Sequence, residues 1–268
     1  MDKQIGFIGF GKMAQAMAGG MLQSRLVKPD QISASMRTEK SKALAKQEFG
    51  IEANSNKEVA RLADILFLAV APYSYIEVIE EMKEDIKTDA IIVTIAAGIT
   101  TGDVEKAFGK KMKVVRTMPN TPSLVGEGMT AVSLNTEVTE DEKKIVEGLL
   151  SSFGKVEFIS ESLMDAIPAI SGSSPAYVYM MIEAMADGGV RQGLSRDQSY
   201  RLAAQAVLGA AQMVLKTGKH PGELKDQVTS PGGATIAAVS TLEQERFRGA
   251  ILAAMDSCTK KVKELGNK

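Results

Sequence analysis

Hydroxyl groups and backbone N–H groups are concentrated in one short stretch, Ser230-Pro231-Gly232-Gly233-Ala234-Thr235. Two adjacent glycines where a helix is expected to begin leave backbone N–H groups open to an anion. Ser230 and Thr235 add hydroxyl donors, so a carboxylate is the expected guest, held by Ser230, Gly232, Gly233, Ala234 and Thr235. An ordinary capped turn is the alternative interpretation.

General acids and bases are scarce. The single histidine, His220, precedes Pro221 and Gly222, where a loop or a helix start is expected. The sequence has no Ser-His-Asp set and no His or Cys cluster for a metal ion, and Lys225 is the remaining candidate proton donor. Reduction of a ketone needs a proton donor to its oxygen. Reduction of a cyclic imine fits this residue set better, because the imine nitrogen can already carry the proton.

The N-terminal stretch has the spacing of a dinucleotide fingerprint. Gly9, Gly11 and Ala14 follow an apolar strand pattern and precede a helical one, which is the context that the pattern G-x-G-x-x-G/A requires. Gly9 permits the turn, Gly11 lets a phosphate approach the backbone, and Ala14 lets the helix pack closely on the strand. A strand, turn and helix without a ligand is the alternative. The predicted cofactor residues here are Ile8, Gly9, Phe10, Gly11, Lys12 and Met13.

The residues after the second predicted strand indicate which dinucleotide binds. NAD enzymes usually place an acid there to hold the ribose 2′-hydroxyl, whereas this chain reads Ser33-Ala34-Ser35-Met36-Arg37-Thr38. Arg37 would pair with a 2′-phosphate, and the adjoining Ser35 and Met36 are assigned to the same site. NADPH is therefore favoured over NADH as the hydride donor. The alternative for Arg37 is a solvated surface side chain.

Three further strand ends are expected at the same edge of the sheet. They are Ala69-Val70-Ala71-Pro72, Ala96-Ala97-Gly98 and Pro119-Asn120-Thr121-Pro122. Because ligands of open α/β sheets bind beyond the carboxyl ends of the strands, all three are predicted to face the cofactor. Asn120 supplies an amide beside the nicotinamide, or else belongs to a rigid crossover loop.

Alternating strand and helix patterns position these residues. Strands are predicted at 3–8, 31–35, 65–70, 90–95, 113–118, 130–134 and 155–159, with helices that include 11–26, 38–49, 75–86 and 139–153. This order indicates an α/β fold with a Rossmann-type, mostly parallel, doubly wound sheet over residues 1–160.

Residues 161–268 carry helical patterns alone and form a second, all-helical domain. Helices are predicted over 174–192, 195–216, from Ser230 and over 246–265. Small residues dominate the two long helices, so this domain has little bulk for a core of its own. We therefore expect it to pack against a second subunit and to serve dimerisation.

Composition and charge limit the class of protein and the partners that this chain can have. Among 268 residues, 44% are hydrophobic and 24% charged, which is an ordinary globular balance, and the net charge of −1 favours neither nucleic acid nor a membrane surface as a partner. No apolar run has the length of a membrane span, and a strand is expected almost at the first residue, without a leader. The single cysteine, Cys258, suits a reducing cytoplasm.

With these motifs in view, the chain resembles the pyrroline-5-carboxylate reductase family over its whole length. The resemblance is carried by Gly6 to Met13, Ala96-Ala97-Gly98, Met118 to Pro122, Ser171 to Tyr177 and, above all, His220 to Thr235. The first motif is shared with β-hydroxyacid dehydrogenases, whereas the last is close to unique to this family.

The resemblance implies an NADPH-preferring enzyme that transfers hydride to the C=N carbon of 1-pyrroline-5-carboxylate and yields L-proline. It implies that Ile8 to Met13 with Asn56, Val70 and Ala97 hold the cofactor. It also implies that the Ser230–Thr235 turn holds the substrate, with Thr235 closest to the chemistry and with Glu161 and Gln227 near the pocket. The implied assembly is a homodimer with interlocked helical domains, or a ring of such dimers.

One position departs from the family pattern. Many members have a lysine in the sequence Ala-Val-Lys-Pro, where this chain has Ala71. That departure leaves a nucleotide-binding regulatory protein as an alternative. A β-hydroxyacid dehydrogenase is the other alternative, but that class needs a lysine on the long inter-domain helix, and residues 174–192 contain none.

Overall fold

The computed structural model describes residues 1–266. The chain divides into two compact units, a sheet unit of Met1–Ser173 with residues 258–266, and a helical unit of Ser174–Ser257. The predicted second domain begins earlier in the chain, at residue 161, and its last two residues lie outside the described part. Residues 161–173 thus pack with the sheet, although they follow its last strand.

The sheet confirms the Rossmann-type prediction. Its strand order is β3-β2-β1-β4-β5-β6-β7-β8, and pairing is parallel except between β6 and β7. The strands are β1 (Ile5–Ile8), β2 (Ile32–Ser35), β3 (Ala53–Asn54), β4 (Ile65–Leu68), β5 (Ile91–Thr94), β6 (Lys113–Met118), β7 (Gly128–Leu134) and β8 (Gly154–Phe158).

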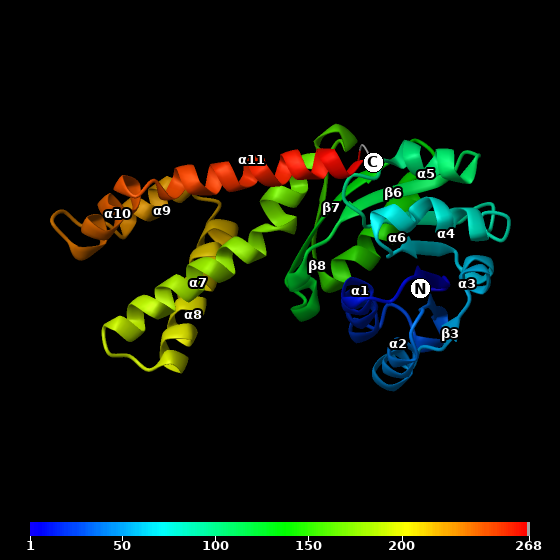
Figure 1. The fold of residues 1–268 in the computed structure, drawn as a ribbon, viewed down its shortest axis with the longest axis horizontal. Helices are drawn as coiled ribbons and strands as arrows, with labels where there is room; N and C mark the ends of the chain where they lie inside the picture. The colour runs from blue at the N-terminus through cyan, green and yellow to red at the C-terminus, as the bar shows by residue number, and fades with distance from the viewer. Residues whose placement is uncertain (267–268) are drawn as a thin grey trace. The chain divides into compact units, whose positions relative to one another are not determined.

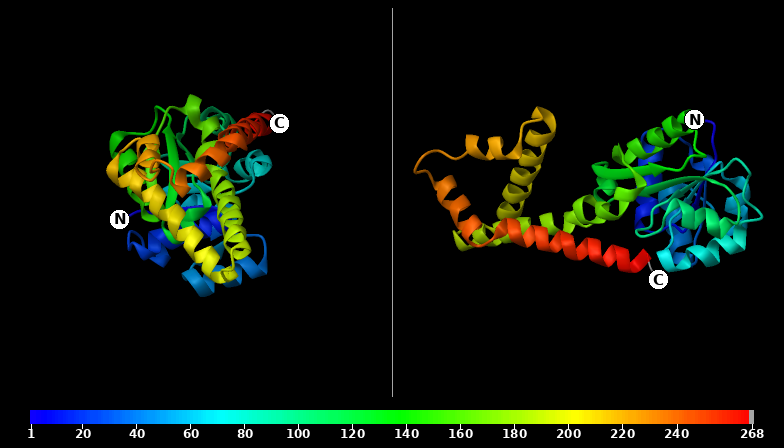
Figure 2. Two further views of the ribbon diagram at one scale, coloured as in Figure 1. Left: turned by 90° about the vertical axis from the view of Figure 1, so that its left-hand side faces the viewer. Right: turned by 90° about the horizontal axis from the view of Figure 1, so that it is seen from above.

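Helices cover both faces of this sheet (Figures 1 and 2). They are α1 (Lys12–Gln23), α2 (Glu39–Leu44), α3 (Asn56–Leu62), α4 (Tyr75–Met82), α5 (Thr101–Phe108) and α6 (Glu140–Leu150). Apolar side chains of α1 and α6 form one buried cluster with the strands, and those of α3, α4 and α5 form a second cluster. These two clusters make the sheet doubly wound, as the alternating pattern predicts.

Strand β4 shows why its sequence is continuously apolar. Ile65 and Phe67 belong to the first cluster, whereas Leu66 and Leu68 belong to the second. Successive side chains of a strand point to opposite faces, so a central strand covered on both faces needs an apolar residue at every position. Phe67 also stacks on Phe7 of β1, with ring centroids 4.9 Å apart.

Several predicted boundaries differ from the observed ones. Helix α1 ends at Gln23 rather than near residue 26. The chain leaves the helical conformation there, and Arg25 has a left-handed φ of 58°. The helix predicted over 38–49 is capped by Thr38, but it changes to a π-helical turn over Ala45–Phe49. The two-residue strand β3 was not predicted, because so short a segment has no periodicity.

The helical unit is built from α7 (Ser174–Arg191), α8 (Arg196–Thr217), α9 (Pro221–Gln227), α10 (Ala234–Gln244) and the first part of α11 (Phe247–Gly266). Small residues bring α7 and α8 together: a Cβ atom added to Gly189 would lie 2.6 Å from Ser199 Oγ. Ser195 and Gln198 form a capping box at the start of α8. Within residues 1–266, none of the helices is long and apolar enough to cross a membrane.

Two helix starts in this unit fall at or near predicted positions. His220, where a loop or a helix start was expected, is the N-cap of α9, and its Nδ1 accepts a hydrogen bond from Gly222 N at 3.0 Å. The helix expected from Ser230 begins at Ala234 instead. Gly232 has a φ of 70°, a left-handed conformation that delays the helix and that glycine adopts without strain.

Candidate functional site

A cleft of about 450 Å³ lies at the carboxyl ends of β1, β2 and β4. It gathers side chains from five separate stretches of the sheet unit, in the place where open α/β sheets bind ligands. Its lining residues are Ile8, Gly9, Phe10, Gly11, Ser35, Met36, Arg37, Thr38, Ser41, Asn54, Ser55, Asn56, Val70, Ala71, Tyr73, Ser74, Val78 and Glu81.

The two glycines of the fingerprint are required for different structural reasons. Gly9 has a φ of 86°, and a Cβ there would lie 2.7 Å from the Ala69 carbonyl oxygen, so a larger residue would be strained and crowded. A Cβ on Gly11 would meet no protein atom within 4 Å. The backbone at Gly11 is therefore open toward the cleft, as a phosphate-binding turn requires.

Helix α1 presents its N-terminus at this turn. Gly11 is its N-cap, and within residues 1–266 no side chain caps the helix and no acid lies in its first turn. The first N–H groups of an α-helix lack intrahelical partners and lie at the positive end of the helix dipole. An anion in the cleft would satisfy these groups, so the residues present fit a dinucleotide pyrophosphate.

Two residues at the end of β2 contribute to the cleft: Ser35 holds the glycine turn and Arg37 provides a positive charge. The buried Ser35 accepts hydrogen bonds from Gly9 N, at its carbonyl oxygen (3.2 Å) and at its hydroxyl (3.3 Å), so it fixes the turn. Arg37 is exposed and forms no ion pair within the described residues. Its guanidinium is free to bind a phosphate, as the NADPH prediction requires.

The opposite wall of the cleft carries Asn56, at the start of α3. Ser55, and not Asn56, is the N-cap, and Ser55 forms a capping box with Glu58. The Asn56 side chain is therefore not used as the cap of α3. Its Nδ2 donates to Glu81 Oε2 at 2.7 Å, so two helices that are separate in sequence are joined at the cleft.

The cleft does not include every predicted cofactor residue. Outside its lining are Lys12, Met13, Ala69, Pro72, Ala96, Ala97, Gly98 and Asn120. Met13 and Ala69 pack against the core, and Lys12 is exposed. The Asn120 amide is already engaged at both ends, because Nδ2 donates to Ser171 O and Oδ1 accepts from Met129 N, each at 2.9 Å.

A buried polar chain links the strand ends behind the cleft. The hydroxyl of Tyr75, whose side chain is 3% exposed, donates to Leu68 O at 2.7 Å and lies 2.8 Å from Thr94 Oγ1. Thr117 Oγ1 donates to Thr94 O at 2.9 Å, and Ala96 N donates to Thr94 Oγ1 at 3.4 Å. Burial raises the pKa of Tyr75 to about 12. This chain connects the carboxyl ends of β4, β5 and β6.

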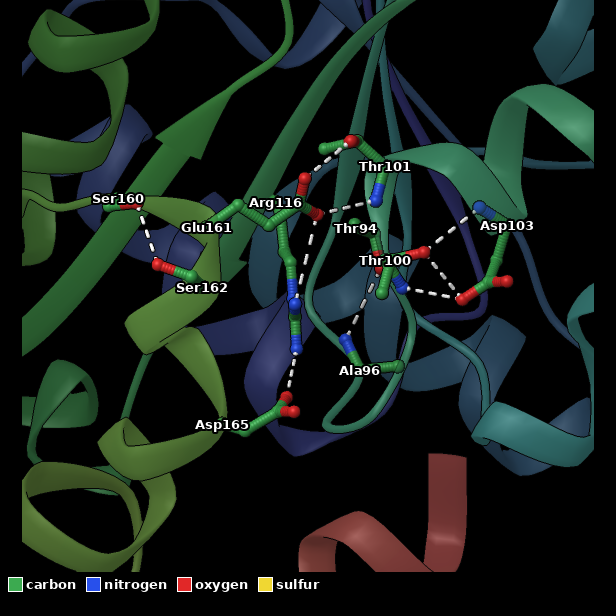
Figure 3. A network of polar contacts seen from close by, with 10 residues as sticks. All are labelled: Thr94, Ala96, Thr100, Thr101, Asp103, Arg116, Ser160, Glu161, Ser162 and Asp165. Carbon is green, nitrogen blue, oxygen red and sulfur yellow. Dashed lines mark hydrogen bonds and ion pairs between the residues drawn. The ribbon is translucent and has the colours of Figure 1, made fainter. Parts of the chain in front are cut away.

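Glu161 lies in a second polar network, which Figure 3 shows. One carboxylate oxygen accepts from Thr101 N at 2.7 Å and the other accepts from Thr101 Oγ1 at 2.8 Å. Arg116, only 4% exposed, places Nη1 3.7 Å from Glu161 and Nη2 2.6 Å from Asp165. Glu161 therefore holds residues 161–166 against the start of α5, just beyond Ala96–Gly98.

The Ser230–Thr235 turn belongs to the helical unit. Gly233 is the N-cap of α10, and no side chain of the described residues caps this helix or places an acid in its first turn. Ser230, Gly232, Ala234 and Thr235 are exposed, and Gly233 is half-buried. Gly233 N already donates to Ser230 O at 3.0 Å, so the donors that remain for the predicted anion site are the first N–H groups of α10 and the Ser230 and Thr235 hydroxyls. Nearby in sequence, Gln227 Nε2 donates to Glu223 Oε1 at 3.0 Å.

Sequence reasoning missed eight residues of the cleft, namely Thr38, Ser41, Asn54, Ser55, Tyr73, Ser74, Val78 and Glu81. Three of these residues, Ser74, Val78 and Glu81, are four and three positions apart in the sequence, which is the spacing of one helix face. What the period alone does not give is which face turns toward the cleft. Within residues 1–266, no group of three His, Cys, Asp or Glu side chains is placed to hold a metal ion.

Two family profiles match the chain. One, described as "Pyrroline-5-carboxylate reductase dimerisation", matches residues 161–265. The other, described as "NADP oxidoreductase coenzyme F420-dependent", matches residues 4–98, which include the fingerprint turn and all the residues that line the cleft.

Relatives and solved structures match over nearly the full length. Pyrroline-5-carboxylate reductase of Escherichia coli (strain K12) is 47% identical and that of Arabidopsis thaliana 41%, covering 99% and 98% of this chain and 99% and 95% of theirs. The structure of Plasmodium falciparum pyrroline carboxylate reductase with NADP bound matches with a TM-score of 0.90 and 33% identity, covering 99% of this chain and 98% of the other. The reductase of Coxiella burnetii matches with a TM-score of 0.90 and 34% identity over 99% of both chains.

Proposed function

This chain belongs to the pyrroline-5-carboxylate reductase family, and on that premise we propose how its residues divide the reaction. The enzyme is an NADP-dependent oxidoreductase that reduces 1-pyrroline-5-carboxylate to L-proline, the final step of proline biosynthesis. The observation that carries this assignment is the full-length match to curated reductases, together with an open dinucleotide cleft.

We assign the dinucleotide to the cleft of the sheet unit. NADPH, when bound, supplies the hydride, with NADH as the alternative donor. The open backbone at Gly11 and the N-terminus of α1 would hold its pyrophosphate, and Arg37 its 2′-phosphate. The remaining predicted contacts, from Asn56, Val70 and the Ala96–Gly98 turn, stay proposals.

We assign the substrate carboxylate to the Ser230–Thr235 turn. Its exposed N–H and hydroxyl donors match a planar carboxylate, and we propose that the Thr235 hydroxyl donates to the carboxylate or accepts from the N–H of the protonated ring nitrogen. A protonated imine accepts hydride at carbon, and the C=N electron pair becomes the nitrogen lone pair of a secondary amine. Such a step needs no further proton from the protein, which fits the scarcity of candidate general acids in the sequence.

Glu161 and Gln227 take supporting roles in this proposal. Because both oxygens of the Glu161 carboxylate are engaged by Thr101, we expect Glu161 to shape the pocket through the start of α5. Gln227 precedes the substrate turn and is held by Glu223, so we place it at the border of the pocket.

The second part of the chain carries a dimerisation domain. We propose a homodimer as the minimal active assembly, with a ring of dimers as the larger form, and we place the functional domain boundary between residues 160 and 161. We also place the enzyme in the cytoplasm, where a chain with a single cysteine would remain reduced.

One assay tests the assignment against its alternatives. Purified protein is mixed with NADPH and 1-pyrroline-5-carboxylate, or with NADP and a 3-hydroxy acid, and the absorbance of the reduced nicotinamide is followed. We expect oxidation of NADPH with the imine alone. Turnover of the hydroxy acid would support a β-hydroxyacid dehydrogenase, and NADPH binding without any turnover would support a regulatory protein.

A further inference from the structure

Glu81 brings a negative charge to the cleft that binds the dinucleotide. It lies on α4 and lines the cleft together with Val78 of the same helix and Ser74, the N-cap residue of that helix. Its carboxylate accepts from Asn56 Nδ2 at 2.7 Å, so it is held at the wall that α3 contributes. An ionised carboxylate accepts and does not donate, which fixes the direction of this hydrogen bond.

This carboxylate has no neutralising partner. Within residues 1–266, no lysine or arginine nitrogen comes within ion-pair distance of it, whereas Glu80, its neighbour on α4, pairs with Lys83 at 2.7 Å. Among the residues that line the cleft, Arg37 is the one cation and Glu81 the one acid. Ala71, which also lines the cleft, adds no charge there.

A dinucleotide entering this cleft is itself negative. Both NADH and NADPH carry a pyrophosphate, and NADPH carries in addition a 2′-phosphate with a charge of about −1.5 to −2 at neutral pH. A carboxylate that lines the cleft repels both, and it repels NADPH more because that ligand has more charge. Arg37 acts in the opposite direction.

We propose that Glu81 is a specificity-determining residue of this cleft: its unpaired carboxylate acts against Arg37, lowers the preference for NADPH and keeps NADH usable as a second hydride donor. The inference rests on the proposed cofactor role of the cleft. Glu81 acts by charge, whereas its hydrogen bond to Asn56 is a separate, structural contribution.

The substitution Glu81→Gln separates these two contributions, because Gln retains an oxygen that can accept from Asn56 and removes the charge. Glu77→Gln is the matched control: it removes the same charge from an exposed position of the same helix that does not line the cleft. Dissociation constants of NADPH and NADH are measured by the fluorescence of the reduced nicotinamide, without substrate, at low and at high salt.

At low salt we expect Glu81→Gln to lower the dissociation constant of NADPH by about threefold to tenfold, and that of NADH less. Salt should shrink the difference, because screening weakens the repulsion in the wild type. Glu77→Gln should leave the ratio of the NADPH and NADH dissociation constants unchanged at both salt concentrations. A ratio of the two constants that is unaltered by Glu81→Gln, or an equal weakening of both ligands, would overturn the proposal. If the wild type binds neither dinucleotide, the proposed function itself fails, which is a distinct result.

Discussion

Arg37 and Glu81 are the two side chains lining the cleft that carry a formal charge. We propose that both act on the dinucleotide through electrostatics. Neither is buried, so their effects are moderate and depend on salt. The residues at the substrate turn differ, because Thr235 and its neighbours are uncharged donors whose contribution depends on hydrogen-bond geometry. Substitutions at this scale should therefore separate cofactor effects from substrate effects.

Arg37→Ala should raise the KM for NADPH by about tenfold and leave that for NADH nearly unchanged, because a guanidinium–phosphate contact is lost only with the phosphorylated ligand. Steady-state kinetics with each dinucleotide measures this. Lys40→Ala, an exposed cation that does not line the cleft, serves as the control. An unchanged KM for NADPH would exclude Arg37 from the site.

Thr235→Ala should lower kcat/KM for the imine by about tenfold to a hundredfold and leave the NADPH dissociation constant nearly unchanged. The reason is that a hydrogen bond to a charged group contributes about 1.5–3 kcal/mol. Thr241→Ala on the same helix is the control, since that hydroxyl bonds back to Ala237 O. Equal losses of turnover and of NADPH binding would refute a substrate role for Thr235.

At the scale of elements, the buried chain from Tyr75 to Thr117 holds three strand ends at the cofactor edge. Its members come from α4, β5 and β6, and their side chains are almost fully buried. Buried polar groups are costly when a partner is missing, so this chain couples the stability of the sheet to the shape of the edge.

Tyr75→Phe should lower the free energy of unfolding by about 1–3 kcal/mol, because Leu68 O loses a buried donor. Chemical denaturation at neutral pH measures the change. Tyr73→Phe is the control, since the Tyr73 side chain is 90% exposed. A loss no larger than that of the control would show that the hydroxyl does not stabilise the strand ends.

The same hydroxyl gives stability a dependence on alkaline pH. The pKa of Tyr75 is about 12 in the folded protein, against about 10 in an unfolded chain. The stabilisation is complete below pH 10 and is lost as pH rises through 12, by about 2–3 kcal/mol in total. Unfolding followed between pH 9 and 12 should show a steeper decline in the wild type than in Tyr75→Phe. Parallel declines would contradict this assignment.

At the scale of the whole molecule, the two units differ in how well they bury their apolar side chains. The sheet unit has two large clusters, whereas in the helical unit α10 has no buried residue and α8 has one buried apolar residue, Ala203. Many large apolar residues of the helical unit are exposed in the single chain, among them Tyr179, Met180, Leu202 and Leu215. Apolar surface of this extent is typical of a subunit interface, which agrees with the dimerisation domain.

Leu215→Glu should raise the dissociation constant of the dimer by at least about tenfold, because it replaces an apolar side chain that is 82% exposed in the single chain with a charged one, which is costly to bury in an interface. Light scattering over a dilution series measures the mass, which for the wild type should be at least twice 28.6 kDa. Ile76→Glu is the control, since Ile76 is 70% exposed but lies in the sheet unit. Identical dilution curves for both variants would exclude Leu215 from the interface.

The features predicted well from the sequence are those made by neighbouring residues. The turn at Gly9 and Gly11 and the continuous apolar strand β4 depend on backbone geometry and patterning within a few residues. The nucleotide fingerprint was found for the same reason, and the Ser230–Thr235 turn stays a predicted anion site. Their presence in one chain was enough to predict the reductase family.

Tertiary structure decided the features that depend on distant residues. It turned Ser35 toward Gly9, engaged both ends of the Asn120 amide, and placed Glu161 on Thr101 and Arg116. It also paired Asn56 with Glu81 across α3 and α4. The sequence by itself determined the dinucleotide fingerprint, because local backbone geometry creates it, and the anion role of the Ser230–Thr235 turn stays a prediction. The packing of helices on the sheet determined which side chains meet in the cleft, because Asn56 and Glu81, which are 25 positions apart, become neighbours only through the fold.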